Sequence, residues 1–132
     1  MSNLSRAAAV AVVALFTIPF LAQEKPRAKV VPLASAGQHD TLLLGGPPET
    51  VTMKSGLVIL QPGQNVGKHS TGSHEEMLLI VEGKGAMMFQ DGTRLEVDPD
   101  HILYCPPQTE HDVTNTGNGV LRYVYIVASA KE

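Results

Sequence analysis

The 132 residues of this chain, 43% hydrophobic and 17% charged, suit a single globular domain. The formal net charge of −3 provides no basic surface for nucleic acid or for an acidic membrane, and the lack of Trp disfavours a platform for stacking single-stranded bases. The single cysteine excludes an intrachain disulfide and a four-cysteine zinc site.

The first 22 residues have the pattern of an export signal. Arg6 supplies a positive charge, and residues 7–22 are almost wholly apolar. This run is short for a bilayer span and close in length to the hydrophobic part of a signal peptide. We therefore expect residues 1–22 to be removed after Ala22 and the protein to be periplasmic or secreted. The alternative is an uncleaved signal that anchors the chain in a membrane, which would be its only membrane contact.

Residues 23–49 are predicted to be a connector, and residues 50–128 an all-β domain. The connector is rich in proline and begins with charged residues, while residues 41–44 could form a short edge strand. Asp91-Gly92 is the strongest hairpin signal in the chain. No stretch after residue 23 shows sustained helical periodicity, so the pattern predicts an antiparallel sandwich or barrel. The predicted strands cover residues 57–60, 74–81, 86–90, 93–97, 102–105, 111–115 and 120–128, with weaker alternation at residues 50–54.

Residues 63–83 carry a concentrated set of candidate metal ligands. If residues 70–73, which are turn-forming types, make a hairpin loop, then His69 and His74 face each other with Cβ atoms about 4.5–5.5 Å apart. Glu76 lies two residues beyond His74 and points to the same face, whereas the preceding glutamate points to the other. Two imidazoles and a carboxylate are ligand types for a divalent transition metal. A solvated strand edge is the alternative for this cluster taken alone.

A second stretch, residues 105–115, brings another histidine. His111 follows the rigid pair Pro106-Pro107 and begins a short alternating strand. His111, Val113 and Asn115 are expected to share one face of that strand. His111 is therefore a candidate ligand, and Cys105 is expected to be a small buried hydrophobic residue rather than a nucleophile.

These two stretches resemble the two sequence motifs of the cupin superfamily. The matching positions are Gly63, His69, Glu76, Gly83, Pro106, His111 and Asn115. Three positions depart: Thr71 stands for the second histidine of the first motif, and Asp100 and Gln108 stand for the two glycines of the second. The resemblance covers roughly residues 50–128. It implies a cupin-type antiparallel β-barrel, also called a double-stranded β-helix or jelly roll, with one bound metal ion.

The resemblance and the hairpin argument together predict one metal site. The expected ligands are His69, His74, Glu76 and His111. His74 would supply the imidazole missing at Thr71, and the Thr71 hydroxyl is expected to contact a ligand water or substrate. Loss of metal is expected for His74→Ala and retention for Glu75→Ala. Nitrogen and carboxylate ligands suit Fe, Mn, Ni, Cu or Zn.

Tyrosines near the site are candidates to line a pocket for a small-molecule ligand. Tyr104 lies in a predicted strand, and Tyr123 and Tyr125 share one face of the last strand. The predicted strand at residues 77–81 is apolar on both faces, so its outer face needs a cover. A second copy of the chain, which would make a homodimer, and the chain's own N-terminal segment are the two alternatives.

Two classes of function fit these features. The resemblance implies a metal-dependent enzyme acting on a small organic molecule, with dioxygenases, isomerases, epimerases and lyases as candidate reactions. The alternative is an exported binding module that holds a small molecule, a sugar or only a metal without turnover. Thr71 in place of a ligand favours this alternative. No nucleophile or separate acid–base pair stands out in the sequence.

Overall fold

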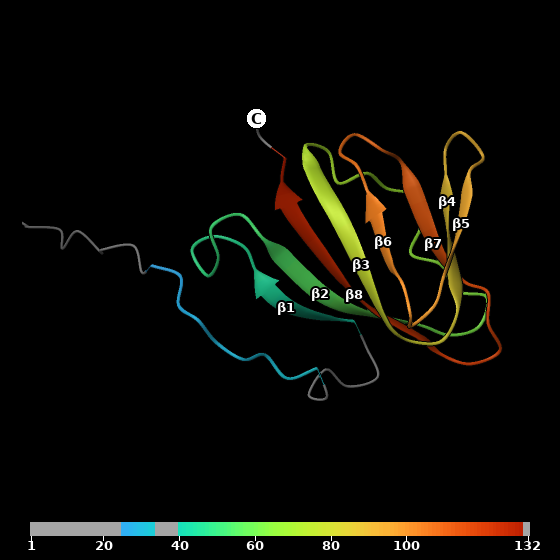
Figure 1. The fold of residues 1–132 in the computed structure, drawn as a ribbon, viewed down its shortest axis with the longest axis horizontal. Coiled ribbons are helices and arrows are strands. Elements are labelled where there is room, and N and C mark those ends of the chain that lie inside the picture. Colours follow the sequence, from blue (N-terminus) through green and yellow to red (C-terminus); the bar gives the residue numbers. More distant parts are fainter. Residues whose placement is uncertain (1–24, 34–39, 131–132) are drawn as a thin grey trace, which may run out of the picture.

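The computed structural model describes residues 25–33 and 40–130, and these residues form strands, turns and loops (Figure 1). The predicted export signal, residues 1–22, lies outside the described residues. Within the described part, no helix has the length and apolar character that crossing a bilayer requires.

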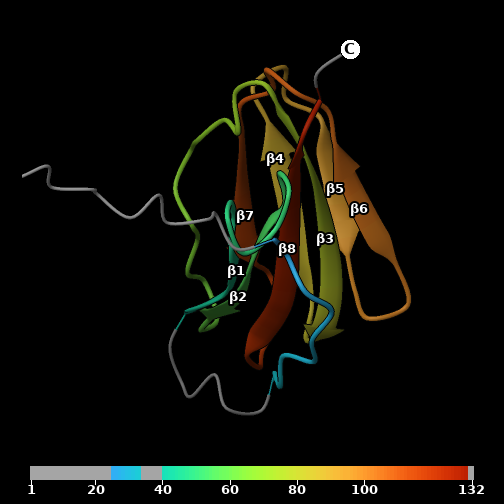
Figure 2. The same cartoon turned by 90° about the vertical axis from the view of Figure 1, so that its left-hand side faces the viewer.

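The described residues contain eight strands, all paired antiparallel, in two sheets that face each other (Figures 1 and 2). One sheet has the order β1-β2-β8-β3-β6 and the other β5-β4-β7. The prediction of an all-β antiparallel fold is therefore confirmed. The strands are β1 Thr41–Gly45, β2 Lys54–Leu60, β3 His74–Glu82, β4 Gly85–Phe89, β5 Arg94–Val97, β6 Ile102–Cys105, β7 His111–Asn115 and β8 Leu121–Ser129.

Local sequence signals explain several strand boundaries. The predicted hairpin at Asp91-Gly92 joins β4 to β5, and Gly92 has the positive φ of 87° that such a tight turn favours. The predicted edge strand at residues 41–44 is present as β1, which pairs with β2. Residues 50–53 differ from the prediction: they form a bend rather than a strand, and β2 begins at Lys54.

The main core lies between the two sheets. Strand alternation turns Leu78 and Ile80 of β3 inward, where they are buried with residues from both sheets. The largest fully buried apolar side chain from the smaller sheet is Met87 of β4. Beyond this core, Glu76 of β3 and His111 of β7 are buried and lie within 2.9 Å of each other.

A second, smaller core lies on the outer face of the larger sheet. Leu57 of β2 and Val124 of β8 are buried there, and Leu33 and Leu43 from the N-terminal part of the chain pack against them. Within residues 25–33 and 40–130, this second core includes no residue of β3 or β6. The exposed side chains of those two strands include Leu79, Val81, Ile102 and Tyr104.

The long connection between β2 and β3 sets the geometry of the site. Its residues run beside β7, with bridges from Asn65 to Thr114 and from His69 to His111. His69 and His111 exchange two backbone hydrogen bonds, each 2.9 Å long. The connection thus extends the smaller sheet as far as His69, and residues 70–73 then cross to the larger sheet, where β3 begins.

Candidate metal centre

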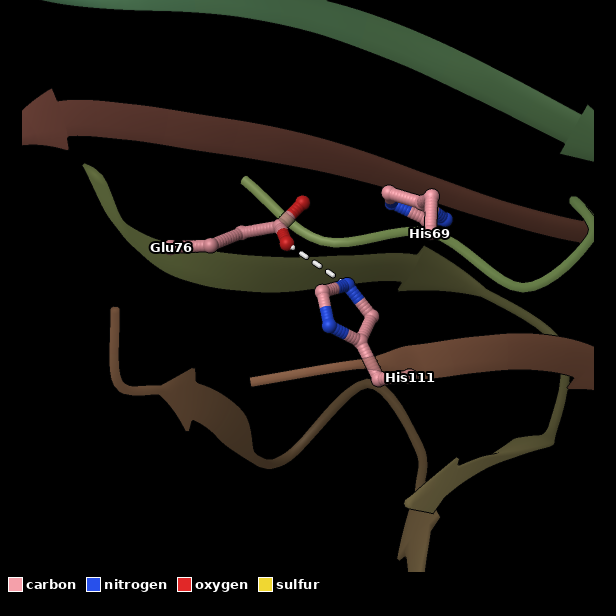
Figure 3. Close-up of side chains that lie close together, drawn as sticks. All are labelled: His69, Glu76 and His111. Atoms are coloured by element: carbon pink, nitrogen blue, oxygen red, sulfur yellow. Dashed lines mark ion pairs between the residues drawn. The ribbon is translucent and has the colours of Figure 1, made fainter. Parts of the chain in front are cut away.

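The structure gathers three potential metal ligands from three separate segments. His69 ends the connection that runs beside β7, Glu76 lies on β3 and His111 is the first residue of β7. One ligand atom from each residue lies within 4.8 Å of the others. In Figure 3 the Glu76 carboxylate and the His111 ring point toward each other, with the His69 ring beside them. The two imidazole rings meet edge to face, with centroids 4.4 Å apart.

Backbone carbonyls orient both imidazole rings. The Nδ1 atom of His69 lies 2.9 Å from the carbonyl oxygen of Gly67, and the Nδ1 atom of His111 lies 3.0 Å from that of Thr109. A carbonyl oxygen only accepts, so Nδ1–H is the donor in each ring, and the lone pair is left on Nε2. This is how metal-binding histidines are usually held: one ring nitrogen is fixed by a hydrogen bond and the other is free for the ion.

Two buried polar atoms in this group lack a hydrogen bond. Glu76 and His111 are only 6% and 1% exposed. Glu76 Oε2 and His111 Nε2 lie 2.9 Å apart, within ion-pair distance, but their alignment does not make a hydrogen bond. They are the only buried side-chain N or O atoms among the described residues without such a partner. Leaving buried polar atoms unsatisfied costs about 1–3 kcal/mol each, so an ion that engaged both atoms would offset this cost.

The separation of these two atoms fits a shared metal ion. Ligand atoms bound about 2.1 Å from one ion at a right angle lie about 3 Å apart. The observed 2.9 Å between Glu76 Oε2 and His111 Nε2 agrees with that spacing. The donor set of two imidazoles and one carboxylate is also one that Fe, Zn and other divalent transition metals accept. The three residues therefore fit a metal ion.

Charge and burial shift the pKa values of several side chains around this centre. The Glu76 carboxylate raises the pKa of His111, although burial opposes this. Burial raises the pKa of the Cys105 thiol to about 11, with a smaller contribution from Glu76. Cys105 is fully buried, as predicted, and its Sγ lies 3.3 Å from His111 Nδ1. Burial is also the main cause that raises the pKa values of Tyr123 and Tyr125, and Glu76 adds to both.

His74 does not join the group of three. The prediction that it faces His69 across a hairpin is wrong, because His69 pairs with His111 in the smaller sheet while His74 begins β3 in the larger one. The loop between them is closed by its own hydrogen bonds. The Thr71 hydroxyl donates to the carbonyl oxygen of His74 at 2.7 Å, and His74 Nδ1 lies 3.2 Å from the Thr71 carbonyl oxygen.

The predicted pocket tyrosines lie in different surroundings. Tyr104 is 55% exposed on the outer side of β6, where its hydroxyl donates to Glu75. Tyr123 is buried in the main core. The half-buried Tyr125, also a predicted pocket candidate, has its ring over Gly56 of the facing strand, where an added Cβ would stand 2.6 Å from ring carbon Cε1.

Comparison with known sequences identifies the architecture. The model of the cupin domain family matches residues 56–127 of this chain. The uncharacterized protein MJ1618 of Methanocaldococcus jannaschii is 34% identical over 64 residues, which make up 48% of this chain and 50% of that protein. The chain thus spans about half the length of this curated relative.

Solved structures agree with the sequence match. BH2720 from Bacillus halodurans superposes with a TM-score of 0.68 and 26% identity, over 81% of this chain and 85% of that one. An RmlC-like cupin family protein with a double-stranded β-helix fold, from Methanocaldococcus jannaschii, gives a TM-score of 0.64 and 17% identity over 78% of this chain and 92% of its own. The predicted double-stranded β-helix, or jelly roll, is therefore confirmed.

Proposed function

Because this chain belongs to the cupin domain family, we propose that it holds one divalent transition metal ion and acts on a small organic molecule. The proposed ligands are His69, Glu76 and His111. The observation that carries the proposal is the pair of unsatisfied buried atoms, Glu76 Oε2 and His111 Nε2, at a spacing that suits two ligands of one ion. An ion there would remove both unsatisfied groups at once.

The chemistry would be shared between ion and chain. An ion bound by two imidazoles and one carboxylate keeps open positions, at which it supplies Lewis acidity or redox chemistry. The chain's part is to hold the ligands, and the Gly67 and Thr109 carbonyls fix the two imidazole rings. Fe, Mn, Ni, Cu and Zn all suit this donor set, and a dioxygenase, isomerase or lyase type of reaction is open to it.

A non-catalytic cupin that binds a small molecule or a sugar is the second candidate. The observation that favours it is Thr71, which stands where the family motif has a second histidine and whose hydroxyl donates within its own loop. A site with one ligand fewer than the family motif provides can retain an ion and a ligand without turning the ligand over. Oxygen uptake with a panel of small organic compounds separates the two candidates. An enzyme of the dioxygenase type consumes oxygen, whereas a binder gains thermal stability from its ligand without forming product.

Metal analysis of the purified protein tests the metal site itself. We expect about one equivalent of a divalent transition metal by plasma mass spectrometry. The matched variants are Glu76→Ala, which removes a proposed ligand, and Glu75→Ala, whose side chain accepts a hydrogen bond from the exposed Tyr104. Glu76→Ala should lose the metal and Glu75→Ala should keep it. Equal metal content in both variants would overturn the proposed ligand set.

We also propose that the uncovered outer face of β3 and β6 is the contact between two copies of the chain. It presents three exposed apolar side chains for this contact, Leu79, Val81 and Ile102, and Tyr104 at the other end of β6 would stay outside it. Ile102, at 62% exposed, stands at the edge of the larger sheet, so Ile102→Lys should leave a monomer where the parent is a dimer. Light scattering after size exclusion measures this, and a monomeric parent protein would refute it.

Export remains our proposal for the first 22 residues. The positive start at Arg6 and the apolar run that follows support it. N-terminal sequencing of the protein recovered from the periplasm or the medium should begin near Gln23. An intact Met1 on a cytoplasmic product would contradict it, and an intact Met1 in the membrane fraction would favour the anchored alternative.

A further inference from the structure

A groove of about 570 Å³ opens beside the candidate metal centre, between the edges of the two sheets. β5 is the edge of the smaller sheet and β6 the edge of the larger one, and no ladder joins them. The groove is lined by the β4–β5 turn, Leu95 of β5, Tyr104 of β6 and the loop that leads to β7. Phe89 forms part of its wall, and the Phe89 ring centroid lies 6.4 Å from that of His111. The groove and the metal centre thus share a wall but not their residues.

The groove combines an apolar surface with negative charge. Phe89, Leu95 and Tyr104 provide the apolar part, and Leu95 and Tyr104 are largely exposed. Asp91 and Glu110 provide two carboxylates, and no lysine, arginine or histidine is among the lining residues. A hydrogen bond from the Thr93 N–H lowers the pKa of Asp91, which keeps this group ionised at neutral pH. An anionic ligand would therefore be repelled and a cationic one attracted.

Backbone strain marks one residue of this groove. Gln108 has a φ of 57° and is the only non-glycine residue of the described chain in the left-handed region. Its N–H donates to the Gly72 carbonyl at 2.7 Å, and the cupin motif has glycine at its position. The side chain lines the groove and makes no hydrogen bond within the described residues. A residue held in this conformation at a cost to the backbone is a candidate for a role in binding.

We propose that this groove binds a small organic cation, an ammonium group on an apolar or aromatic body. The body would lie against Phe89, Leu95 and Tyr104, while Asp91 and Glu110 would attract the charge. Aromatic faces add a favourable interaction with an ammonium ion. The Gln108 side-chain carbonyl is a free acceptor for an ammonium N–H. This inference goes beyond the proposed metal site and does not depend on a bound ion.

Three probes of similar size test the charge preference. 2-Phenylethylammonium, 2-phenylethanol and phenylacetate share an aromatic body and carry a positive, a neutral and a negative group. We expect calorimetric titration of the purified protein to show the cation binding at least tenfold more tightly than the alcohol, and the anion not binding. Equal affinity for cation and alcohol, tighter binding of the anion, or no binding of the cation would each overturn the proposal.

Two substitutions locate the binding, with a matched control. Glu110→Gln keeps the shape and removes a charge, so the Kd for the cation should rise by roughly tenfold. Asp100→Asn removes a charge from the exposed turn at the far end of β5 and β6, and should leave the Kd within about twofold. Metal content measured on the same samples shows whether Glu110→Gln has disturbed the neighbouring His111. If Glu110→Gln and Asp100→Asn changed the Kd for the cation equally, the cation would bind elsewhere, and the proposed binding site in the groove would be refuted.

Gln108→Gly separates a binding role from a structural one. Glycine takes a positive φ without strain, so the midpoint of unfolding in urea should stay the same or rise. Loss of the side-chain acceptor should at the same time weaken cation binding several-fold. A variant with unchanged cation affinity would remove Gln108 from the proposal, and one that unfolds more readily would give the residue a structural role instead.

Discussion

The two ends of β7 carry buried polar side chains that differ in how their hydrogen bonds are met. Asn115 and His111 are each 1% exposed. The Asn115 amide donates to the carbonyls of Leu60 and Gly119, both at 2.8 Å, and accepts from the Gly117 N–H at 2.9 Å. His111 Nε2 has no hydrogen bond, and neither has the Glu76 oxygen that faces it.

This difference separates a structural role from a binding role. Asn115 ties the end of β2 to the turn before β8, and the fold uses every polar atom of its side chain. At the other end of the same strand, the fold orients His111 through Nδ1 and leaves Nε2 unused. Buried polar atoms without partners are rare in folded proteins, and a bound ion or an ordered water is among the reasons for them. Three experiments can break or sharpen this comparison.

The largest expected effect is on stability, at the Asn115 end. Asn115→Leu would remove the side-chain donor to the carbonyls of Leu60 and Gly119 and would leave the Gly117 N–H with the Lys84 carbonyl as its acceptor, which should lower the free energy of unfolding by about 3–5 kcal/mol. Urea denaturation measures this. Asn118→Leu is the matched control, because Asn118 is exposed in the same turn and its replacement should cost less than about 0.5 kcal/mol. If Asn115→Leu lowered the free energy of unfolding as little as Asn118→Leu does, the structural role of Asn115 would be contradicted.

A smaller effect is expected on metal affinity, at the other end. His69→Ala removes a member of the three-residue group and should weaken metal binding by at least about 100-fold, or about 2.7 kcal/mol. His74→Ala is the control, because His74 lies outside that group. The metal affinity of this variant should stay within about threefold of that of the parent protein. Competition with a coloured chelator measures both. If His74→Ala loses as much as His69→Ala, the four-ligand site expected from the sequence would hold instead.

The smallest expected effect is a pH dependence of the metal-free protein. Glu76 raises the folded-state pKa of His111 above its ordinary value of 6.5, so the stabilisation is complete below about pH 6.5 and is lost as the pH rises through the raised pKa. Each unit of pKa difference corresponds to about 1.4 kcal/mol, and burial reduces the shift here. Urea denaturation in chelator at pH 6, 7 and 8 should show stability falling with pH. Metal affinity should change in the opposite direction, because the ion needs neutral imidazole.

His111→Gln is the comparison that assigns this pH effect. The exposed His101 also has a raised pKa, caused by Asp98, and contributes a background with the same sign. The part of the slope that disappears in His111→Gln belongs to the Glu76–His111 pair. A slope that is unchanged in His111→Gln and disappears in His101→Gln would show that the buried pair does not bind the extra proton.

Strand alternation and turn chemistry are local properties, and the sequence by itself determined what depends on them. The β4–β5 hairpin at Asp91-Gly92, the inward face shared by His111, Val113 and Asn115, and the burial of Cys105 all follow from residues that are neighbours in the chain. The resemblance to the two cupin motifs then predicted the fold, because it assigns two stretches that are distant in the sequence to one known architecture.

Which strands lie beside one another depends on contacts between distant residues, and only the tertiary structure decided it. Residues 70–73 read equally well as a hairpin loop or as a crossing between two sheets, and the choice of the crossing gives His69 the partner His111 in place of His74. The groove between β5 and β6, with the strained Gln108 on its wall, exists because two sheet edges from different layers meet there without pairing. The unsatisfied atoms of Glu76 and His111 have the same origin: each side chain is placed by its own strand, and their 2.9 Å approach results from how the two sheets pack.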